Sequence, residues 1–238
     1  MVQDLPKRPR VAYSRITSVR RDKEAVMSRR TPALLMAMLV SFLATLAAQQ
    51  PEITSMSFRR EYLEKFPWTL SNTTAGDAMM LRILVESRGA KNGVEVGTNT
   101  GYGAINMGIG FERTGGQLTT IEIDPRTAAT ARSHLAKVGL DKVVTVVEGD
   151  ALKVLPTLPG TFDFVFIDAS KPDYLKYLKA LEAKLKPGAV IVADNVIDYA
   201  RQMGDFLEYV QSSPLYDTQI IRASMQKNDG MSVSYKIR

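Results

Sequence analysis

From about residue 93 onward, short apolar runs alternate with amphipathic segments along the chain. The apolar runs predict strands, and the amphipathic segments repeat apolar residues at helical spacing. The predicted strands are Gly93–Gly97, Gln117–Asp124, Val143–Glu148, Phe162–Asp168, Ala189–Asn195, Tyr216–Ala223 and Ser232–Ile237. The predicted helices are Phe58–Phe66, Ala75–Arg88, Gly101–Phe111, Pro125–Val138, Ala151–Leu155, Tyr174–Leu185 and Arg201–Gln211. This alternation indicates an α/β fold.

The middle strands are apolar on both sides, as in Phe164–Ile167 and Val190–Val192. Strands of this kind are typical of a parallel sheet that is covered by helices on both faces. We therefore predict a doubly wound, mostly parallel, seven-stranded sheet with ligands at the carboxyl ends of its strands. Only a turn region, Lys227–Gly230, separates the last two strands, so we expect a C-terminal antiparallel hairpin.

The first fifty residues differ from the rest of the chain. Residues 1–30 lack apolar periodicity, whereas Ala33–Ala48 form an almost unbroken apolar run. That run is shorter than the roughly 20 residues that span a bilayer, and two arginines precede it, which favours a signal peptide. The alternatives are a membrane anchor and a buried helix, and translation could also start at Met27. The localisation of the protein therefore stays open. We therefore divide the chain into a basic disordered tail (1–30), an apolar signal or anchor segment (31–50) and one globular domain (51–238).

The net charge of +6 belongs to that tail. Residues 1–30 hold nine basic and three acidic residues, and the remaining 22 basic and 22 acidic residues cancel over residues 31–238. A nucleic-acid-binding domain carries its basic surface on the fold itself, so we expect no nucleic-acid partner. The chain has no cysteine, which excludes disulfides, thiolate metal sites and a cysteine nucleophile.

A glycine-containing loop, Glu95–Gly103, follows the first predicted strand. Gly97 and Gly101 allow a tight turn close to a ligand, but their spacing is not the G-x-G-x-x-G of dinucleotide-binding loops. Glu95 would repel a pyrophosphate and suits a cationic ligand. Glu122 ends the second strand, where this class of fold holds ribose hydroxyls. Together they indicate a nucleoside with a positive end, such as S-adenosylmethionine (SAM); the alternative is ordinary tight-turn glycines and a solvated strand end.

Hard oxygen donors gather at the ends of two further strands. Asp168 ends the fourth strand, and Asp194 and Asn195 end the fifth, which would lie about 4.8 Å away if the two strands are neighbours. Oxygen donors without His or Cys select Mg²⁺ or a similar divalent cation over zinc. Lys171 lies three residues after Asp168, where a nearby cation and burial would make it a general base. Ordinary strand-end acids and a surface lysine are the structural alternative.

Six motifs occur in order between Glu95 and Val196, within a matching stretch of about 160 residues. They are Glu-Val-Gly-Thr-x-x-Gly-Tyr, Thr-Ile-Glu-Ile-Asp-Pro, Glu-Gly-Asp-Ala, Phe-Asp-x-Val-Phe-Ile-Asp-Ala-x-Lys, Leu-Lys-Pro-Gly and Ala-Asp-Asn-Val. With these motifs the stretch from about Gly76 to Lys236 resembles the class I SAM-dependent, metal-dependent O-methyltransferases, the group that contains catechol O-methyltransferase and the caffeoyl-CoA enzymes. The short segment after Asp194 favours the catechol branch.

The resemblance implies a Rossmann-like methyltransferase fold and a role for each matching residue. Asp168, Asp194 and Asn195 would bind Mg²⁺, and Lys171 would take the proton from a hydroxyl of an aromatic vicinal diol. SAM would be bound by Ala75, Glu95, Gly97, Thr98, Asn99, Gly101, Tyr102, Gly103, Glu122, Asp150, Ala151 and Asp168.

Four positions depart from the catechol pattern. Gln226 stands at the position where the catechol enzymes have a glutamate that holds the second hydroxyl of the substrate, and Ser170 stands where they have a tryptophan before the catalytic lysine. Tyr199 replaces a proline that borders their pocket, and Gly103 replaces a serine of their glycine loop. We expect Trp68 to line the pocket instead. The predicted activity is Mg²⁺-dependent methyl transfer to a catechol-like diol by a monomer or homodimer. The alternatives are a caffeoyl-CoA-type substrate, a non-catalytic SAM- or metal-binding protein, and a nicotinamide-dependent dehydrogenase.

Overall fold

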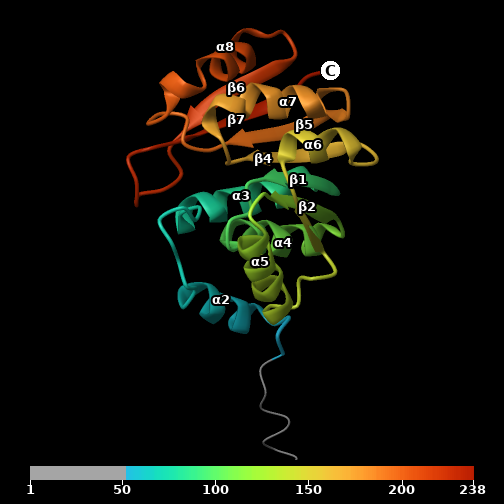
Figure 1. Cartoon of the computed structure of the whole chain (residues 1–238), viewed down its shortest axis with the longest axis vertical. Coiled ribbons are helices and arrows are strands. Elements are labelled where there is room, and N and C mark those ends of the chain that lie inside the picture. The colour runs from blue at the N-terminus through green and yellow to red at the C-terminus, as the bar shows by residue number, and fades with distance from the viewer. Residues whose placement is uncertain (1–51) are drawn as a thin grey trace, which may run out of the picture. The chain divides into compact units, whose positions relative to one another are not determined.

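The computed structural model describes residues 52–238, which form an α/β unit around a central sheet (Figure 1). Within these residues the sheet has seven strands in the order β3-β2-β1-β4-β5-β7-β6. β1 to β5 run parallel, and β7 is antiparallel to both β5 and β6, so the predicted fold and C-terminal hairpin are confirmed. The strands are β1 (Asn92–Val96), β2 (Gln117–Glu122), β3 (Val144–Glu148), β4 (Phe162–Ile167), β5 (Leu185–Ala193), β6 (Tyr216–Ile221) and β7 (Met231–Lys236).

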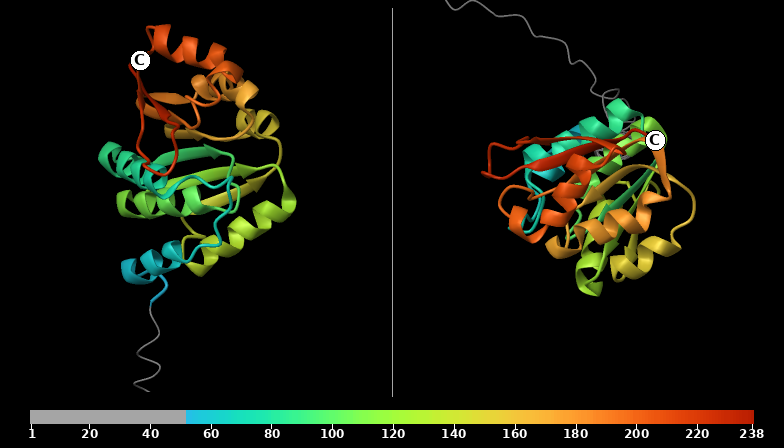
Figure 2. Two further views of the ribbon diagram at one scale, coloured as in Figure 1. Left: turned by 90° about the vertical axis from the view of Figure 1, so that its left-hand side faces the viewer. Right: turned by 90° about the horizontal axis from the view of Figure 1, so that it is seen from above.

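Helices cover both faces of the sheet (Figure 2). α3, α4 and α5 pack on one face, where Phe164 and Phe166 of β4 contribute to their core. α6, α7 and α8 pack on the other, where Val165 and Ile167 point, because successive residues of a strand face opposite sides. The α-helices are α2 (Met56–Glu64), α3 (Ala75–Arg88), α4 (Tyr102–Thr114), α5 (Pro125–Lys137), α6 (Ala151–Val154), α7 (Tyr174–Glu182) and α8 (Gly204–Ser212). Short 3₁₀ turns are η1 (Leu155–Thr157), η2 (Lys171–Asp173) and η3 (Ala200–Gln202).

Local sequence explains where the helices next to the strand ends begin. α3 begins after Thr74, whose side chain accepts a hydrogen bond from the N–H of Asp77, and it ends at Gly89 in the left-handed conformation. α5 begins after Asp124, whose carboxylate accepts from the N–H of Thr127. These caps fix the helix termini that face the carboxyl edge of the sheet.

The largest error in a predicted boundary lies near Leu185. The prediction extended a helix to this residue and began the next strand at Ala189, whereas α7 ends at Glu182 and β5 begins at Leu185. The pairing between β4 and β5 shifts register after Phe162, and Gly188 has φ +81°. This irregularity lets the strand accommodate a Pro-Gly pair that suggests a turn in the sequence.

The predictions for the tail and for the apolar run Ala33–Ala48 lie outside the described residues. Within residues 52–238, no helix is long and apolar enough to cross a membrane.

Candidate active site

Three strand ends meet at one edge of the sheet. The register of β1, β4 and β5 places Gly97, Asp168 and Asp194 next to one another. The N–H of Asp194 donates to the carbonyl of Ile167 at 3.1 Å, which continues the pairing of β4 and β5 to this edge. Gly97 has φ +97°, and a Cβ there would lie 2.1 Å from the carbonyl oxygen of Asp168. The two strands can therefore approach this closely only with glycine at position 97.

Glu95 lies on β1 beneath the glycine loop and is 1% exposed. Its Oε2 has no hydrogen-bond partner within residues 52–238. Burial raises the pKa of its carboxyl to about 8, and the charges of Asp168 and Glu122 contribute to the rise. A Cβ at Gly103 would come within 3.1 Å of Glu95 Oε1, so the glycine leaves space beside the carboxylate. An unpartnered buried carboxylate beside open space fits a cationic group of a ligand.

Glu122, at the end of β2, is held by backbone donors. The N–H of Asn99 donates to its Oε2 at 2.8 Å, and the N–H of Asp124 donates to its Oε1 at 3.0 Å. Each oxygen keeps a further lone pair, so the carboxylate can also accept from ribose hydroxyls. The hydroxyls of Thr98 and Thr120 are hydrogen-bonded to each other, which ties the loop to β2.

A cavity of about 380 Å³, here called the cofactor cavity, opens over these strand ends. Its volume lies within the range of small-molecule sites. Of the residues predicted to bind the cofactor, it is lined by Gly97, Thr98, Asn99, Gly103, Glu122, Asp150, Ala151 and Asp168. The other four do not line it. Glu95 lies beneath it, Gly101 forms the turn before α4, and Ala75 and Tyr102 line a second cavity.

Lys171 begins η2, directly above the end of β4. Its Nζ lies 2.7 Å from Asp168 Oδ1 and donates to Tyr174 Oη at 2.8 Å. Tyr174 Oη donates in turn to the carbonyl oxygen of Asp194 at 3.1 Å. The structure thus links the predicted base and both predicted acids through one chain of contacts.

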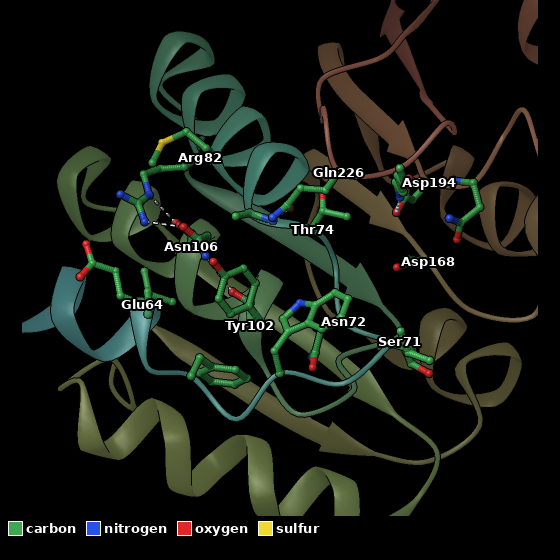
Figure 3. Close-up of a pocket in the computed structure, with 18 of the residues that line it drawn as sticks. Glu64, Ser71, Asn72, Thr74, Arg82, Tyr102, Asn106, Asp168, Asp194 and Gln226 are labelled. Atoms are coloured by element: carbon green, nitrogen blue, oxygen red, sulfur yellow. Dashed lines mark hydrogen bonds and ion pairs between the residues drawn. The ribbon is translucent and has the colours of Figure 1, made fainter.

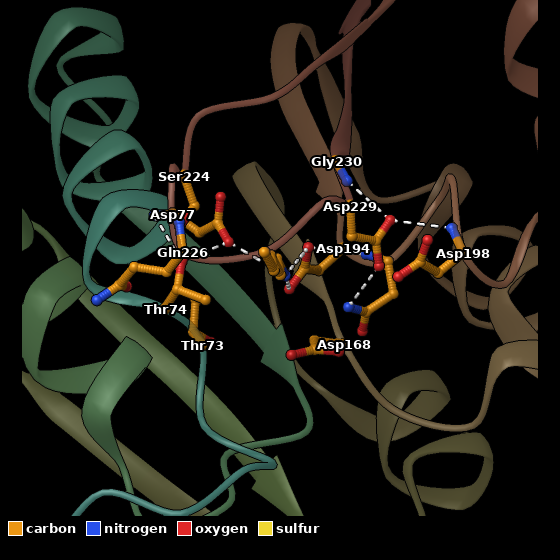
Figure 4. Close-up of polar contacts among 12 residues, drawn as sticks. Thr73, Thr74, Asp77, Asp168, Asp194, Asp198, Ser224, Gln226, Asp229 and Gly230 are labelled. Carbon is orange, nitrogen blue, oxygen red and sulfur yellow. Dashed lines mark hydrogen bonds and ion pairs between the residues drawn. The ribbon is translucent and has the colours of Figure 1, made fainter.

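Asp194 is 1% exposed and is neutralised by a lysine that sequence reasoning did not identify (Figure 4). Lys227 Nζ lies 2.9 and 2.7 Å from the two carboxylate oxygens of Asp194, and 3.1 Å from Asp77 Oδ2. Burial raises the pKa of Asp194 to about 6, the charge of Asp168 adds to the rise, and Lys227 opposes it.

Asn195 is oriented by Asp229, another residue that sequence reasoning missed. Asn195 has φ +61°, and its Nδ2 donates to Asp229 Oδ2 at 3.0 Å, which leaves its amide oxygen available. Asp229 Oδ1 accepts from the N–H groups of Ile197 and Asp198 at 3.0 and 3.1 Å. The Asp-Gly pair at positions 229 and 230 suggested only a turn in the sequence, so neither contact was foreseen.

The donor chemistry of Asp168, Asp194 and Asn195 fits a hard divalent cation. No group of three His, Cys, Asp or Glu side chains suited to a metal occurs in the described part of the chain, so the candidate set is two carboxylates and one amide oxygen. Such oxygens suit Mg²⁺. The ammonium groups of Lys171 and Lys227 contact the same carboxylates, and a cation on those oxygens would have to replace or share these contacts.

A larger cavity of about 1100 Å³, here called the substrate cavity, adjoins the cofactor cavity, and Figure 3 shows residues that line it. It runs from Arg82 and Asn106 at one end to Asp168 and Asp194 at the other. Trp68 lines it, as expected. Gln226 also lines it, and its Oε1 accepts from the N–H of Ala75 at 3.1 Å. The two cavities share the lining residues Ser71, Asn72, Asp168 and Ala169.

A profile of the O-methyltransferase family matches residues 46–208. The chain belongs to this family. A catechol O-methyltransferase of Niastella koreensis is 40% identical over 121 residues, which cover 49% of this chain and 54% of that enzyme, so the match spans about half the length of the relative. A caffeoyl-CoA O-methyltransferase of Medicago sativa is 28% identical over 207 residues, covering 79% of this chain and 83% of the relative.

Solved O-methyltransferase structures share the fold. The O-methyltransferase of Bacillus cereus in complex with SAH is 25% identical, with a TM-score of 0.67, over 83% of this chain and 97% of that one. TomG of Streptomyces achromogenes in complex with SAM is 26% identical, with a TM-score of 0.68, over 83% of this chain and 95% of that one. The family resemblance predicted from the motifs is confirmed.

Proposed function

We propose that this O-methyltransferase transfers a methyl group from SAM to one hydroxyl of a catechol-like vicinal diol, with the help of a bound Mg²⁺ or similar divalent cation. The observation that carries the proposal is the meeting of two cavities at Asp168. In the cofactor cavity, the carboxylate of Glu122 can accept hydrogen bonds from ribose hydroxyls. The substrate cavity is lined by Lys171 and by the three candidate metal ligands. The bound SAM of TomG supports the choice of cofactor.

The cofactor end of the reaction depends on two carboxylates. Glu95 offers its unpartnered Oε2 to the positive end of SAM, and Glu122 accepts from the ribose hydroxyls. Gly97 keeps the backbone of β1 close to Asp168, so that the two cavities join where the methyl group would leave one and enter the other. Holding both reactants in such a near-attack arrangement can supply up to about 7–11 kcal/mol of a barrier.

At the substrate end, the chain supplies a proton acceptor and three metal ligands. Asp168, Asp194 and Asn195 would hold the cation, and Asp229 fixes the amide of Asn195. When bound, SAM supplies an electrophilic methyl group, and the cation supplies a positive charge that lowers the pKa of a diol hydroxyl. In its neutral amine form, Lys171 would take up the hydroxyl proton at Nζ, a nitrogen that contacts with Tyr174 and Asp168 hold in position.

The test is an incubation of the full chain with labelled SAM, Mg²⁺ and a panel of aromatic diols, with monophenols as substrate controls. We expect methylated product from diols only, and loss of turnover in EDTA that added Mg²⁺ restores. Lys171→Met should lower kcat by about 10²–10⁴-fold, because that is the usual contribution of a general base. The matched control is Lys176→Met, which changes a surface lysine on α7 that pairs with Asp173 among the described residues.

The outcomes separate the alternatives. Full activity of Lys171→Met, or undiminished activity in EDTA, would refute the proposed mechanism. SAM binding without product from any diol would favour a non-catalytic SAM-binding protein. The volume of the substrate cavity, about 1100 Å³, favours a diol that carries a further group over catechol itself. Caffeoyl-CoA therefore belongs in the panel as the second candidate, and a higher kcat/KM for it than for catechol would select that branch.

A further inference from the structure

The loop between β6 and β7 carries a cation into the candidate metal site. This loop spans residues 222–230 and brings Lys227 to Asp194, where the ammonium group contacts both carboxylate oxygens at 2.9 and 2.7 Å. The same ammonium lies 3.1 Å from Oδ2 of Asp77, which belongs to the first turn of α3. Lys227 thus bridges two acids that lie on different elements, and Figure 4 shows these acids, Asp77 and Asp194.

Asp77 has unused capacity for a cation. It is 1% exposed, its Oδ2 accepts from the hydroxyl of Thr74 at 2.7 Å, and its Oδ1 is buried without a partner within residues 52–238. An unpartnered oxygen of a buried carboxylate is energetically unfavourable, so a further donor to it would stabilise the site. Lys227 is the lysine that already touches this carboxylate.

The loop that carries Lys227 also rests on α3. Gln226 Oε1 accepts from the N–H of Ala75, and Gln226 N–H donates to Ser224 Oγ at 3.0 Å. A Cβ at Gly76 would lie 2.9 Å from the Cα of Ser224, so the loop packs directly on the first turn of the helix. A movement of Lys227 along this turn is therefore transmitted to the loop, which lines the substrate cavity.

We propose that Lys227 is a displaceable internal counter-ion: a divalent cation that binds Asp194 expels the ammonium group, which moves fully onto Asp77 and shifts the 222–230 loop. The reason is competition, because both oxygens of Asp194 are already in contact with Lys227 Nζ, and a cation that takes them as ligands meets a like charge there. Lys227 is thus a positioning residue that couples occupation of the metal site to the wall of the substrate cavity. This inference rests on the metal dependence proposed above.

The first experiment measures divalent-cation affinity without reference to turnover. Mg²⁺ is titrated calorimetrically into the full-length protein, Lys227→Met, Asp77→Asn and the double variant. Lys227→Met should bind Mg²⁺ at least about tenfold more tightly, because one charge-assisted contact no longer competes. Asp77→Asn should bind it more weakly, because the displaced ammonium group loses its destination.

The double variant distinguishes this relay from simple electrostatics. If Asp77 acts through Lys227, Asp77→Asn has little further effect once Lys227→Met is present. If Asp77 attracts the metal directly, Asp77→Asn weakens Mg²⁺ binding equally with and without Lys227→Met, and the relay is refuted. Because both single variants leave a buried carboxylate or ammonium with fewer partners, their thermal unfolding is recorded with and without Mg²⁺. Lys227→Met should then gain more in Tm from Mg²⁺ than the unsubstituted protein does.

The second experiment follows the loop. The chain has no cysteine and Met225 is fully exposed, so Met225→Cys provides a unique site for an environment-sensitive fluorophore. Mg²⁺ should change the emission with the same affinity that calorimetry reports, and Lys227→Met should abolish the change. A label that stays silent while Mg²⁺ binds and turnover is intact would overturn this inference and leave the proposed function standing. Absence of Mg²⁺ binding by every variant would overturn both.

Discussion

Gly97 offers the most direct test of how the two cavities are brought together. The perturbation is Gly97→Ala, which adds one methyl group at a residue with φ +97°. The new Cβ would lie 2.1 Å from the carbonyl oxygen of Asp168 and 2.8 Å from its carbonyl carbon. Both atoms belong to backbone at the end of a central strand, so no side-chain rotation can relieve the contact.

Two other glycines separate the contributions to the expected loss. Gly89 has φ +63° but nothing within 4 Å of its Cβ position, so Gly89→Ala should cost only the conformational term of about 1–2 kcal/mol. Gly204 has neither a positive φ nor a close neighbour, so Gly204→Ala should change the free energy of unfolding by at most about 0.5 kcal/mol. Gly97→Ala adds an overpacking term of about 1–3 kcal/mol to the conformational one, for a total of about 2–5 kcal/mol.

The assay is urea unfolding of the three variants beside the unsubstituted chain, followed by circular dichroism, together with calorimetric titration of SAM. We expect the order Gly97→Ala, Gly89→Ala, Gly204→Ala in loss of stability, and weakened SAM binding for Gly97→Ala alone. If Gly97→Ala loses no more stability than Gly89→Ala, the close approach of β1 and β4 is not a constraint, and the steric reasoning is wrong.

Three further predictions concern buried charges. Burial raises the pKa of Glu95 to about 8, so its contribution to stability is complete below its usual pKa and is lost as the pH rises through 8. Between pH 5 and 9 the Tm of the cofactor-free protein should therefore fall more than the Tm of Glu95→Gln. Parallel curves of Tm against pH for the two proteins would contradict this. Arg59 is 1% exposed and donates to the carbonyl oxygens of Val138 and Gly139 as well as pairing with the more exposed Glu112, so Arg59→Met should lower the free energy of unfolding in urea by about 1–3 kcal/mol, the usual cost of leaving buried acceptors without a donor. Asp229→Ala should weaken calorimetric Mg²⁺ binding about 10–100-fold by releasing Asn195, whereas Asp198→Ala, on an exposed side chain, should not.

The strand ends were predictable because a parallel sheet imposes their arrangement. The apolar runs around Phe164 and Val190 predicted buried parallel strands, and the carboxyl ends of such strands necessarily share one edge. The residues that follow them, Asp168 and Asp194, were therefore expected to be neighbours before any contact was known. The same pattern predicted a tight turn at Gly97 after the first strand and a carboxylate, Glu122, at the end of the second strand.

The partners of these residues were not predictable, because they come from distant segments with no periodicity. Lys227 lies 33 positions after Asp194 and 150 after Asp77, and a lysine in a turn is normally solvated. Asp229 similarly belongs to a turn whose sequence specifies a chain reversal and not a contact with Asn195. Local propensity describes such residues one at a time, whereas their contacts depend on how the hairpin folds back over the sheet.

The two cavities share four lining residues and are otherwise lined by different parts of the chain, which has a consequence for how the acceptor specificity of the enzyme can change. The cofactor cavity is built largely from strand ends and borders one connecting segment at Ser71–Thr73, whereas the substrate cavity takes more of its lining from connecting segments such as Trp68–Thr74 and Asn195–Tyr199. Connecting segments tolerate replacement far better than strand ends do. A library that varies only Trp68, Leu70 and Tyr199, which line the substrate cavity and not the cofactor cavity, can explore new acceptor molecules while the lining of the cofactor cavity stays unchanged. The same division lets natural selection change the acceptor without rebuilding the donor site.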